Sequence, residues 1–264
     1  MFERFFRKRV LVPPQEPLPE SWSNLIAHEI PLCARLPEPS RTALGPLVQK
    51  FMADKSFEGC GGLELQEEMK VTIAAQACVL LLHRRTEVYP RVSTILVYPN
   101  AYLTKVATPI GGGGWLEGED VFLGEATLPE VVILSWRHIK AGNAYTRSGR
   151  NLVLHEFAHQ LDREDGSMNG APLLESSRRY REWSRAMTFE FQRLERQADL
   201  GRRTVIDDYG ATNPAEFFAV VTETFFERPH TLRRHHPTLY EQFAAFYHQD
   251  PSAWAVAVAT DSDP

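Results

Sequence analysis

Residues 152–162 of the chain read Leu-Val-Leu-His-Glu-Phe-Ala-His-Gln-Leu-Asp. On a helix, His155 and His159 lie on one face and one turn apart, because a turn contains about 3.6 residues. The apolar residues around them predict that the same helix is largely buried. Burying two histidines and a glutamate in an apolar helix is costly unless another group engages them. The stretch therefore predicts a helix that begins near Arg150, ends within residues 162–166 and holds a metal ion.

The two histidines have the spacing of zinc ligands. Imidazoles separated by one helical turn can both reach a single Zn²⁺ at about 2.0–2.1 Å. Glu156 points to the side, where it can take a proton from a metal-activated water without displacing it. A surface helix with two unrelated polar histidines is the alternative, and the apolar flanks argue against it. We expect one zinc ion per chain, with Glu156 as the general base.

A catalytic zinc ion needs a third protein ligand and one open position, and three places in the sequence offer such a ligand. Asp165 follows the second histidine by six residues, but that arrangement needs a glycine at its midpoint, where this chain has an aspartate. Asp207 or Asp208 could serve from a loop. Glu216 opens a predicted helix over residues 213–227, whose apolar stripe can pack against the motif helix. We favour Glu216, and an ordinary glutamate that complements the helix dipole is the alternative.

Three further polar residues could serve the same site. Tyr209 lies seven residues before Glu216, and a phenol held over the metal can donate a hydrogen bond to a developing oxyanion. A tyrosine packed in a loop is the alternative. Asp162 and Glu223 could each accept a hydrogen bond from the second ring nitrogen of a ligand histidine. For Asp162 the alternative is an exposed aspartate at a helix end.

The whole chain predicts an α+β fold that is helix-rich with a small mixed sheet. Apolar periodicity and capping residues indicate the helices, and β-branched or aromatic runs bounded by Pro and Gly indicate the strands. We expect a flexible lead-in over residues 1–20, a single domain over residues 21–252 and a tail over residues 253–264. The expected helices lie at 40–53, 66–84, 150–162, 175–200, 213–227 and 237–248, and the expected strands at 93–98, 120–123 and 131–136.

Composition argues against several classes of function. The 264 residues carry a net charge of −5, so the chain lacks the concentrated positive field that nucleic-acid binding needs. Its three cysteines form no Cys-x-x-Cys pair, which is typical of buried thiols in a reducing compartment. The N-terminus lacks the apolar stretch of a secretion signal, and the longest mostly apolar run, residues 71–82, falls short of the ~20 residues that span a bilayer. We expect a cytoplasmic protein that binds neither nucleic acid nor membrane.

Two stretches of the sequence together resemble a known family. Residues 155–162, with Asp208-Tyr209-Gly210 and Asn-Pro-Ala-Glu-Phe-Phe-Ala-Val at 213–220, are similar to the Mlc titration factor A family of bacterial zinc peptidases. A looser likeness extends from about Trp22 to Pro251. The site of that family is in turn similar to the catalytic domain of anthrax lethal factor. Some relatives carry an additional histidine upstream that contacts the metal in a closed state, and residues 101–137 of this chain contain none.

The resemblance implies a zincin-like metallopeptidase fold and cytoplasmic aminopeptidase activity on peptide substrates. It also implies binding to Mlc, the repressor of glucose phosphotransferase genes, and so a role in glucose-uptake gene expression. By matching position, it implies His155, His159 and Glu216 as zinc ligands, Glu156 as base and Tyr209 as transition-state donor. A different class stays open, because the same helix faces would serve a non-catalytic, zinc-stabilised protein that sequesters a transcription regulator.

Overall fold

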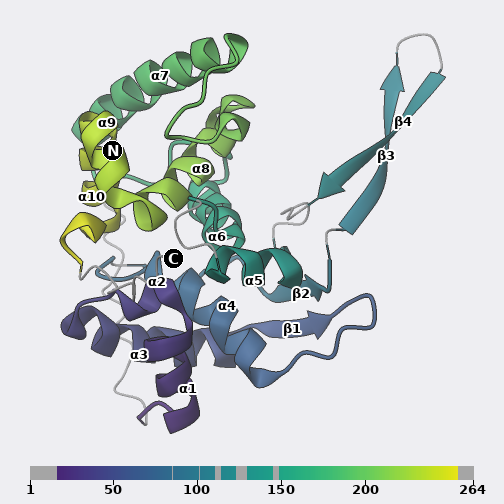
Figure 1. The fold of residues 1–264 in the computed structure, drawn as a ribbon, viewed down its shortest axis with the longest axis vertical. Helices are drawn as coiled ribbons and strands as arrows, with labels where there is room; N and C mark the ends of the chain where they lie inside the picture. The colour runs from purple at the N-terminus through teal and green to yellow at the C-terminus, as the bar shows by residue number, and fades with distance from the viewer. Residues whose placement is uncertain are drawn as a thin grey trace, which may run out of the picture.

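The structure is a computed structural model, and it describes residues 17–84, 86–100, 102–110, 114–122, 130–144 and 149–254. Most of the predicted lead-in and tail lie outside these residues, so the predicted division of the chain stays a prediction. Helices dominate and a small sheet lies among them, which confirms the α+β class (Figure 1). The α-helices are α1 Glu20–Asn24, α2 Pro31–Ala34, α3 Glu38–Asp54, α4 Glu67–Val79, α5 Trp136–Ala144, α6 Leu152–Asp162, α7 Ser177–Asp199, α8 Pro214–Glu227, α9 Pro229–His235 and α10 Pro237–Tyr247.

Short helices of other types complete the helical part of the described chain. A π-helix, η1 Leu25–Glu29, continues from α1, and three 3₁₀-helices follow later in the chain. These are η2 Arg163–Asp165, η3 Asp208–Ala211 and η4 Pro251–Ala253. Along the chain, η2 follows α6 directly and η3 comes shortly before α8, the two helices that carry the predicted metal ligands.

The strands form two separate sheets within the described residues. β1 Ser56–Gly59, β2 Thr94–Tyr98 and β5 Val131–Ser135 form a parallel sheet in the order β1-β2-β5, so β5 is an edge strand. β3 Tyr102–Ile110 and β4 Gly114–Phe122 form an antiparallel pair. The expectation of one mixed sheet is therefore wrong in detail, because the parallel and antiparallel pairings occur in different sheets. The pattern that indicated strands carries no information on which of them pair.

The six predicted helices are present with ends within two residues of the predicted ones, except that α4 ends at Val79 rather than at residue 84. The helix that we expected to begin at Ser40 begins at Glu38, with Pro37 as its N-cap residue. Proline is tolerated in the first turn, where its missing N–H would have no helical partner, and Pro39 fits there. Ser40 lies inside the helix instead, with its hydroxyl 3.0 Å from Nε2 of His83.

The motif helix α6 lies at the centre of the fold. It contacts α4 and β5 on one side and α8 on the other (Figure 1). Phe157 is fully buried, and its ring centroid lies 4.6 Å from that of Tyr89 and 5.6 Å from that of Phe51 in α3. This aromatic cluster joins α6 to the N-terminal helices and fixes its position in the core.

A second aromatic cluster joins the C-terminal helices. Trp183 of α7 stacks on Phe243 of α10 at 5.1 Å and contacts Phe218 of α8 at 5.8 Å. Trp254, which we expected in the tail, is 8% exposed and packs against Phe226 of α8. The packed core of the described residues therefore includes Trp254.

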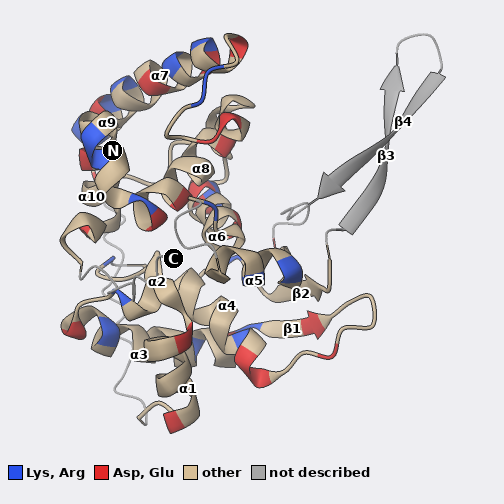
Figure 2. Cartoon of the chain, viewed as in Figure 1, with Lys and Arg blue, Asp and Glu red and all other residues tan. Residues whose placement is uncertain are grey.

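The charged residues are dispersed over the surface elements. Along α7, Arg residues are interspersed with Glu and Asp residues, so the two signs of charge are not separated (Figure 2). Within the described ranges, no helix is both long and apolar enough to cross a membrane.

Truncating Phe157 tests the role of the first aromatic cluster. Phe157→Ala should lower the free energy of unfolding by about 3–5 kcal/mol, because it leaves a cavity between α6 and α3. Denaturant unfolding measures the change. The matched control is Phe189→Ala, since Phe189 is 61% exposed, and its effect should stay within about 0.5 kcal/mol. Equal effects of the two substitutions would show that the cluster does not anchor the helix.

Candidate metal centre

The N-terminus of α6 is fixed by Asn151. Its side-chain Oδ1 accepts a hydrogen bond from the backbone N–H of Leu154 at 3.1 Å, which satisfies one of the free donors of the first turn. The helix that starts here is apolar on most sides, and Val153, Leu154, Phe157, Ala158 and Leu161 are all buried. Its buried histidines therefore have to find partners on a neighbouring element.

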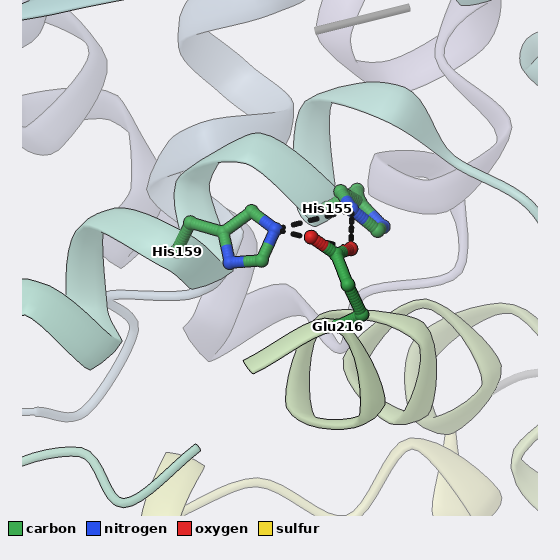
Figure 3. A group of neighbouring side chains, drawn as sticks. All are labelled: His155, His159 and Glu216. Carbon is green, nitrogen blue, oxygen red and sulfur yellow. Dashed lines mark hydrogen bonds and ion pairs between the residues drawn. The ribbon is translucent and has the colours of Figure 1, made fainter. Parts of the chain in front are cut away.

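That neighbouring element is α8. Asn213 caps it by accepting hydrogen bonds from the N–H groups of Ala215 and Glu216, and Pro214 occupies the first helical position. The cap sets the helical phase of Glu216, and the packing of α8 against α6 then directs this carboxylate toward the two histidines (Figure 3).

Three donor atoms converge between the helices. Nε2 of His155 lies 3.2 Å from Nε2 of His159 and 3.0 Å from Oε2 of Glu216, and the His159 nitrogen lies 3.4 Å from the same oxygen. The side chains are only 12%, 6% and 15% exposed, respectively. Of the described residues, these three form a group of ligand atoms close enough to share one metal ion.

The pKa values in this group reflect the attraction between the carboxylate of Glu216 and the two imidazoles. Burial alone would raise the pKa of Glu216, but hydrogen bonds to His155 and His159 lower it to about 2. Burial would lower the pKa of His155, yet its hydrogen bonds to Glu216 and Glu223 raise that pKa well above the usual range. The carboxylate thus stays ionised, which is the form that binds a cation.

Glu156 lies beside this group on the next position of the helix. It is 3% exposed, and its Oε2 has no hydrogen-bond partner among the described residues. Burial is the largest cause of a raised pKa for this carboxyl group. A buried carboxylate with a raised pKa and a free oxygen is suited to accept a proton.

Comparison with known proteins identifies the family. The family described as glucose-regulated metallo-peptidase M90 matches residues 3–248. This chain belongs to that family. The chain is 41% identical over 238 residues to an uncharacterized protein of Synechocystis sp., covering 90% of this chain and 86% of that one. It is 29% identical over 258 residues to the Mlc titration factor A proteins of Yersinia pestis and Yersinia pseudotuberculosis, covering 95% of this chain and 94% of each relative.

As a member of a metallopeptidase family, the chain is expected to hold a metal ion, and His155, His159 and Glu216 could hold it. The other carboxylates considered as third ligands are engaged elsewhere in this M90 protein. Asp165 is exposed and accepts a hydrogen bond from the N–H of Ser167 at 2.8 Å. Asp207 forms an ion pair with Arg150, and the neighbouring Asp208 is exposed.

Glu223 lies behind the candidate metal-binding group formed by His155, His159 and Glu216. Its Oε1 is 2.7 Å from Nδ1 of His155, the ring nitrogen that faces away from Glu216. A carboxylate in this position fixes the tautomer and the orientation of a ligand imidazole. The structure therefore favours the predicted contact of Glu223 with a histidine.

Asp162 does not take the role considered for it. Its Oδ2 accepts a hydrogen bond from the N–H of Gly170 at 2.8 Å, while Nδ1 of His159 has no partner in the described part of the chain. The alternative of an exposed aspartate is also wrong, because Asp162 is fully buried and burial raises its pKa to about 6.

Tyr209 stands at the open side of the M90 site. It lies on η3, is 55% exposed, and its ring centroid is 6.1 Å from that of His155. The alternative of a tyrosine packed inside a loop does not fit this exposure. A side chain here can reach a molecule that approaches the candidate metal-binding group from solvent.

Sequence reasoning missed three polar residues near the site. Gln76 interrupts the apolar run at 71–82, Asn151 precedes the motif, and Glu227 ends α8. All three are buried and hydrogen-bonded to one another through Asn151. Gln76 was the one indication in the sequence, because a glutamine inside an apolar helix needs a buried hydrogen-bond partner.

Proposed function

We propose that this M90 family member is a zinc-dependent peptidase, with His155, His159 and Glu216 as metal ligands and Glu156 as general base. The observation that carries the proposal is the convergence of three donor atoms from two helices, beside the buried carboxylate of Glu156, whose Oε2 has no hydrogen-bond partner among the described residues. A zincin-like fold is part of the proposal and is supported by the α6–α8 arrangement.

The donor atoms fit a tetrahedral zinc ion. Ligand atoms at about 2.0–2.1 Å from such an ion lie roughly 3.3 Å from one another. The three separations between Nε2 of His155, Nε2 of His159 and Oε2 of Glu216 are 3.0, 3.2 and 3.4 Å. Two nitrogens and one carboxylate oxygen are also the donor set of catalytic zinc sites that keep a fourth position open.

The protein groups divide the work of hydrolysis. A bound zinc ion supplies a Lewis acid that polarises the scissile carbonyl and lowers the pKa of water. Glu156 takes the proton from the attacking water and returns it to the leaving amine, for which its raised pKa is suited. Glu223 holds the His155 ring through Nδ1. Tyr209 donates a hydrogen bond to the oxyanion that forms at the substrate carbonyl.

Substrate peptides are proposed to align on β5. This strand is at the edge of the parallel sheet and lies against α6, so an extended peptide could pair with it next to the metal ligands. Aminopeptidase specificity, implied by the family resemblance, is part of the proposal. So is a cytoplasmic location.

A second function is suggested by the relatives called Mlc titration factor A. We propose that the chain binds the repressor Mlc, and so affects the expression of glucose-uptake genes. If the metal only stabilises the fold, this binding would be the sole function, and the protein would be a scaffold rather than an enzyme.

Glu156→Gln tests the general base. The variant should keep its zinc, because Glu156 is not a ligand, and should lose peptide hydrolysis by several orders of magnitude, because an amide cannot accept the proton. Metal content is measured by elemental analysis and turnover with aminoacyl reporter substrates. Hydrolysis at the wild-type rate by the zinc-loaded variant would rule out the assigned role.

Tyr209→Phe tests the proposed oxyanion donor. The substitution keeps the ring near His155 and removes only the hydroxyl group, so kcat should fall by about 10²–10³ with little change in KM. Steady-state kinetics of the two proteins gives both values. An unchanged kcat would place Tyr209 outside the reaction.

Removal of the metal tests whether the protein is an enzyme or a non-catalytic scaffold. Chelation should abolish hydrolysis of the reporter substrates, and added Zn²⁺ should restore it. Binding of purified Mlc, followed by calorimetry before and after chelation, shows whether the two activities are independent. A protein that binds Mlc and never shows metal-dependent hydrolysis would be a scaffold, contrary to the enzymatic proposal.

A further inference from the structure

A chain of buried polar contacts runs from the metal-binding group into the N-terminal helices. Glu223, which contacts His155, also accepts a hydrogen bond from the backbone N–H of Asn151 through its other oxygen. The side-chain amide of Asn151 donates to Oε1 of Gln76 in α4 at 2.7 Å and to Oε1 of Glu227 at 2.9 Å. The path therefore links α6, α8 and α4 through one residue.

Asn151 is the junction because all of its polar groups on this side are engaged. Its Oδ1 caps α6, its amide holds two partners, and its backbone N–H holds a third. It is 3% exposed, so water does not compete for these bonds. A shift of Asn151 would move the start of the motif helix and the carboxylate behind His155 together.

The outer end of the path is anchored by Arg35, the residue that follows α2. Its Nη2 lies 3.2 Å from Oε2 of Glu227 and 3.0 Å from the carbonyl oxygen of Phe226. Glu227 lies four residues after Glu223, so two carboxylates share one helical face and repel each other. The guanidinium of Arg35 and the amide of Asn151 offset the negative charge of Glu227. Glu223 is therefore free to direct its carboxylate at His155.

We infer that Asn151 is a positioning residue of the metal centre, and that Gln76 holds it in place. Asn151 fixes Glu223, Glu223 fixes the imidazole of His155, and the geometry of the zinc site is thereby coupled to α4. This inference rests on the proposed zinc site but goes beyond it, because neither residue is a ligand or touches the reacting atoms. A purely structural network would instead stabilise the fold and leave the metal affinity unchanged.

Asn151→Ser is the first test, and Gln76→Met is the second. Serine is an equally good N-cap and keeps the backbone N–H that bonds Glu223, so α6 should still form, but serine lacks the amide that ties the start of α6 and Glu223 to Gln76 and Glu227. Methionine has about the volume of glutamine and removes the acceptor at the far end of the same bond. If Asn151→Ser fails to fold, Gln76→Met alone tests the inference.

Two matched controls separate positioning from stability. Gln249→Met removes another buried glutamine, whose amide donates to the carbonyl oxygen of Val79 in α4 and which has no bond to Asn151. Ser176→Ala removes the N-cap of α7, whose hydroxyl accepts a hydrogen bond from the N–H of Arg179 and not from a member of this network. Both controls should lower the Tm of the metal-free protein.

The readouts are the affinity for Zn²⁺ alone, by competition with a chromophoric chelator, and the visible spectrum of the Co²⁺-loaded protein. Asn151→Ser should lower the zinc affinity about 10–100-fold and change the Co²⁺ spectrum, with a smaller loss in the same direction for Gln76→Met. The controls should match the wild type in both. The inference is overturned if the folded test variants bind zinc within about twofold of the wild type. Failure of the wild type itself to bind zinc would instead reject the proposed function.

Discussion

The packing of α6 against α8 is the constraint on which the site depends. Each helix is largely apolar, so burying both faces brings them into contact along their length. The polar residues on the facing stripes are then forced together in a dry environment, where every one of them needs a partner. Glu216 meets His155 and His159 because α8 has no other place for that carboxylate once Asn213 has fixed its first turn.

The packing of α6 against α8 also explains the order in which residues of the two helices pair. Along α8 the carboxylates recur at Glu216, Glu223 and Glu227, spacings that keep them on one helical face. Along α6 their partners recede from His159 through His155 to Asn151. The two helices therefore run in opposite directions past each other, and one register sets both the ligand group and the support behind it. A shift of one turn would separate all of these pairs at once.

The sequence predicted this part of the structure well because its signals are local. The spacing of the two histidines and the Asn-Pro start of α8 both fix residues on a helical face, and the place of Glu216 opposite the histidines follows from pairing two amphipathic helices. Strand pairing is a long-range property, so the parallel order of β1, β2 and β5 and the existence of the short β1 were not predictable in the same way. Asn151 was missed for a related reason, since its partners lie 72 to 76 residues away.

One side of the site is buried and the other faces solvent, and the proposed chemistry needs this difference. Glu156, His159 and Glu223 are buried against the core, which excludes water from the side where ligand and base must stay fixed. Tyr209, in contrast, projects from a tight turn on the solvent side. On the proposed function a substrate approaches past Tyr209, because among the described residues the opposite face of α6 packs against α4 and buries Phe157. The residues whose positions the reaction requires to be fixed, Glu156, His159 and Glu223, are thus the most tightly packed. Tyr209, which would contact the substrate, is the least packed of the four.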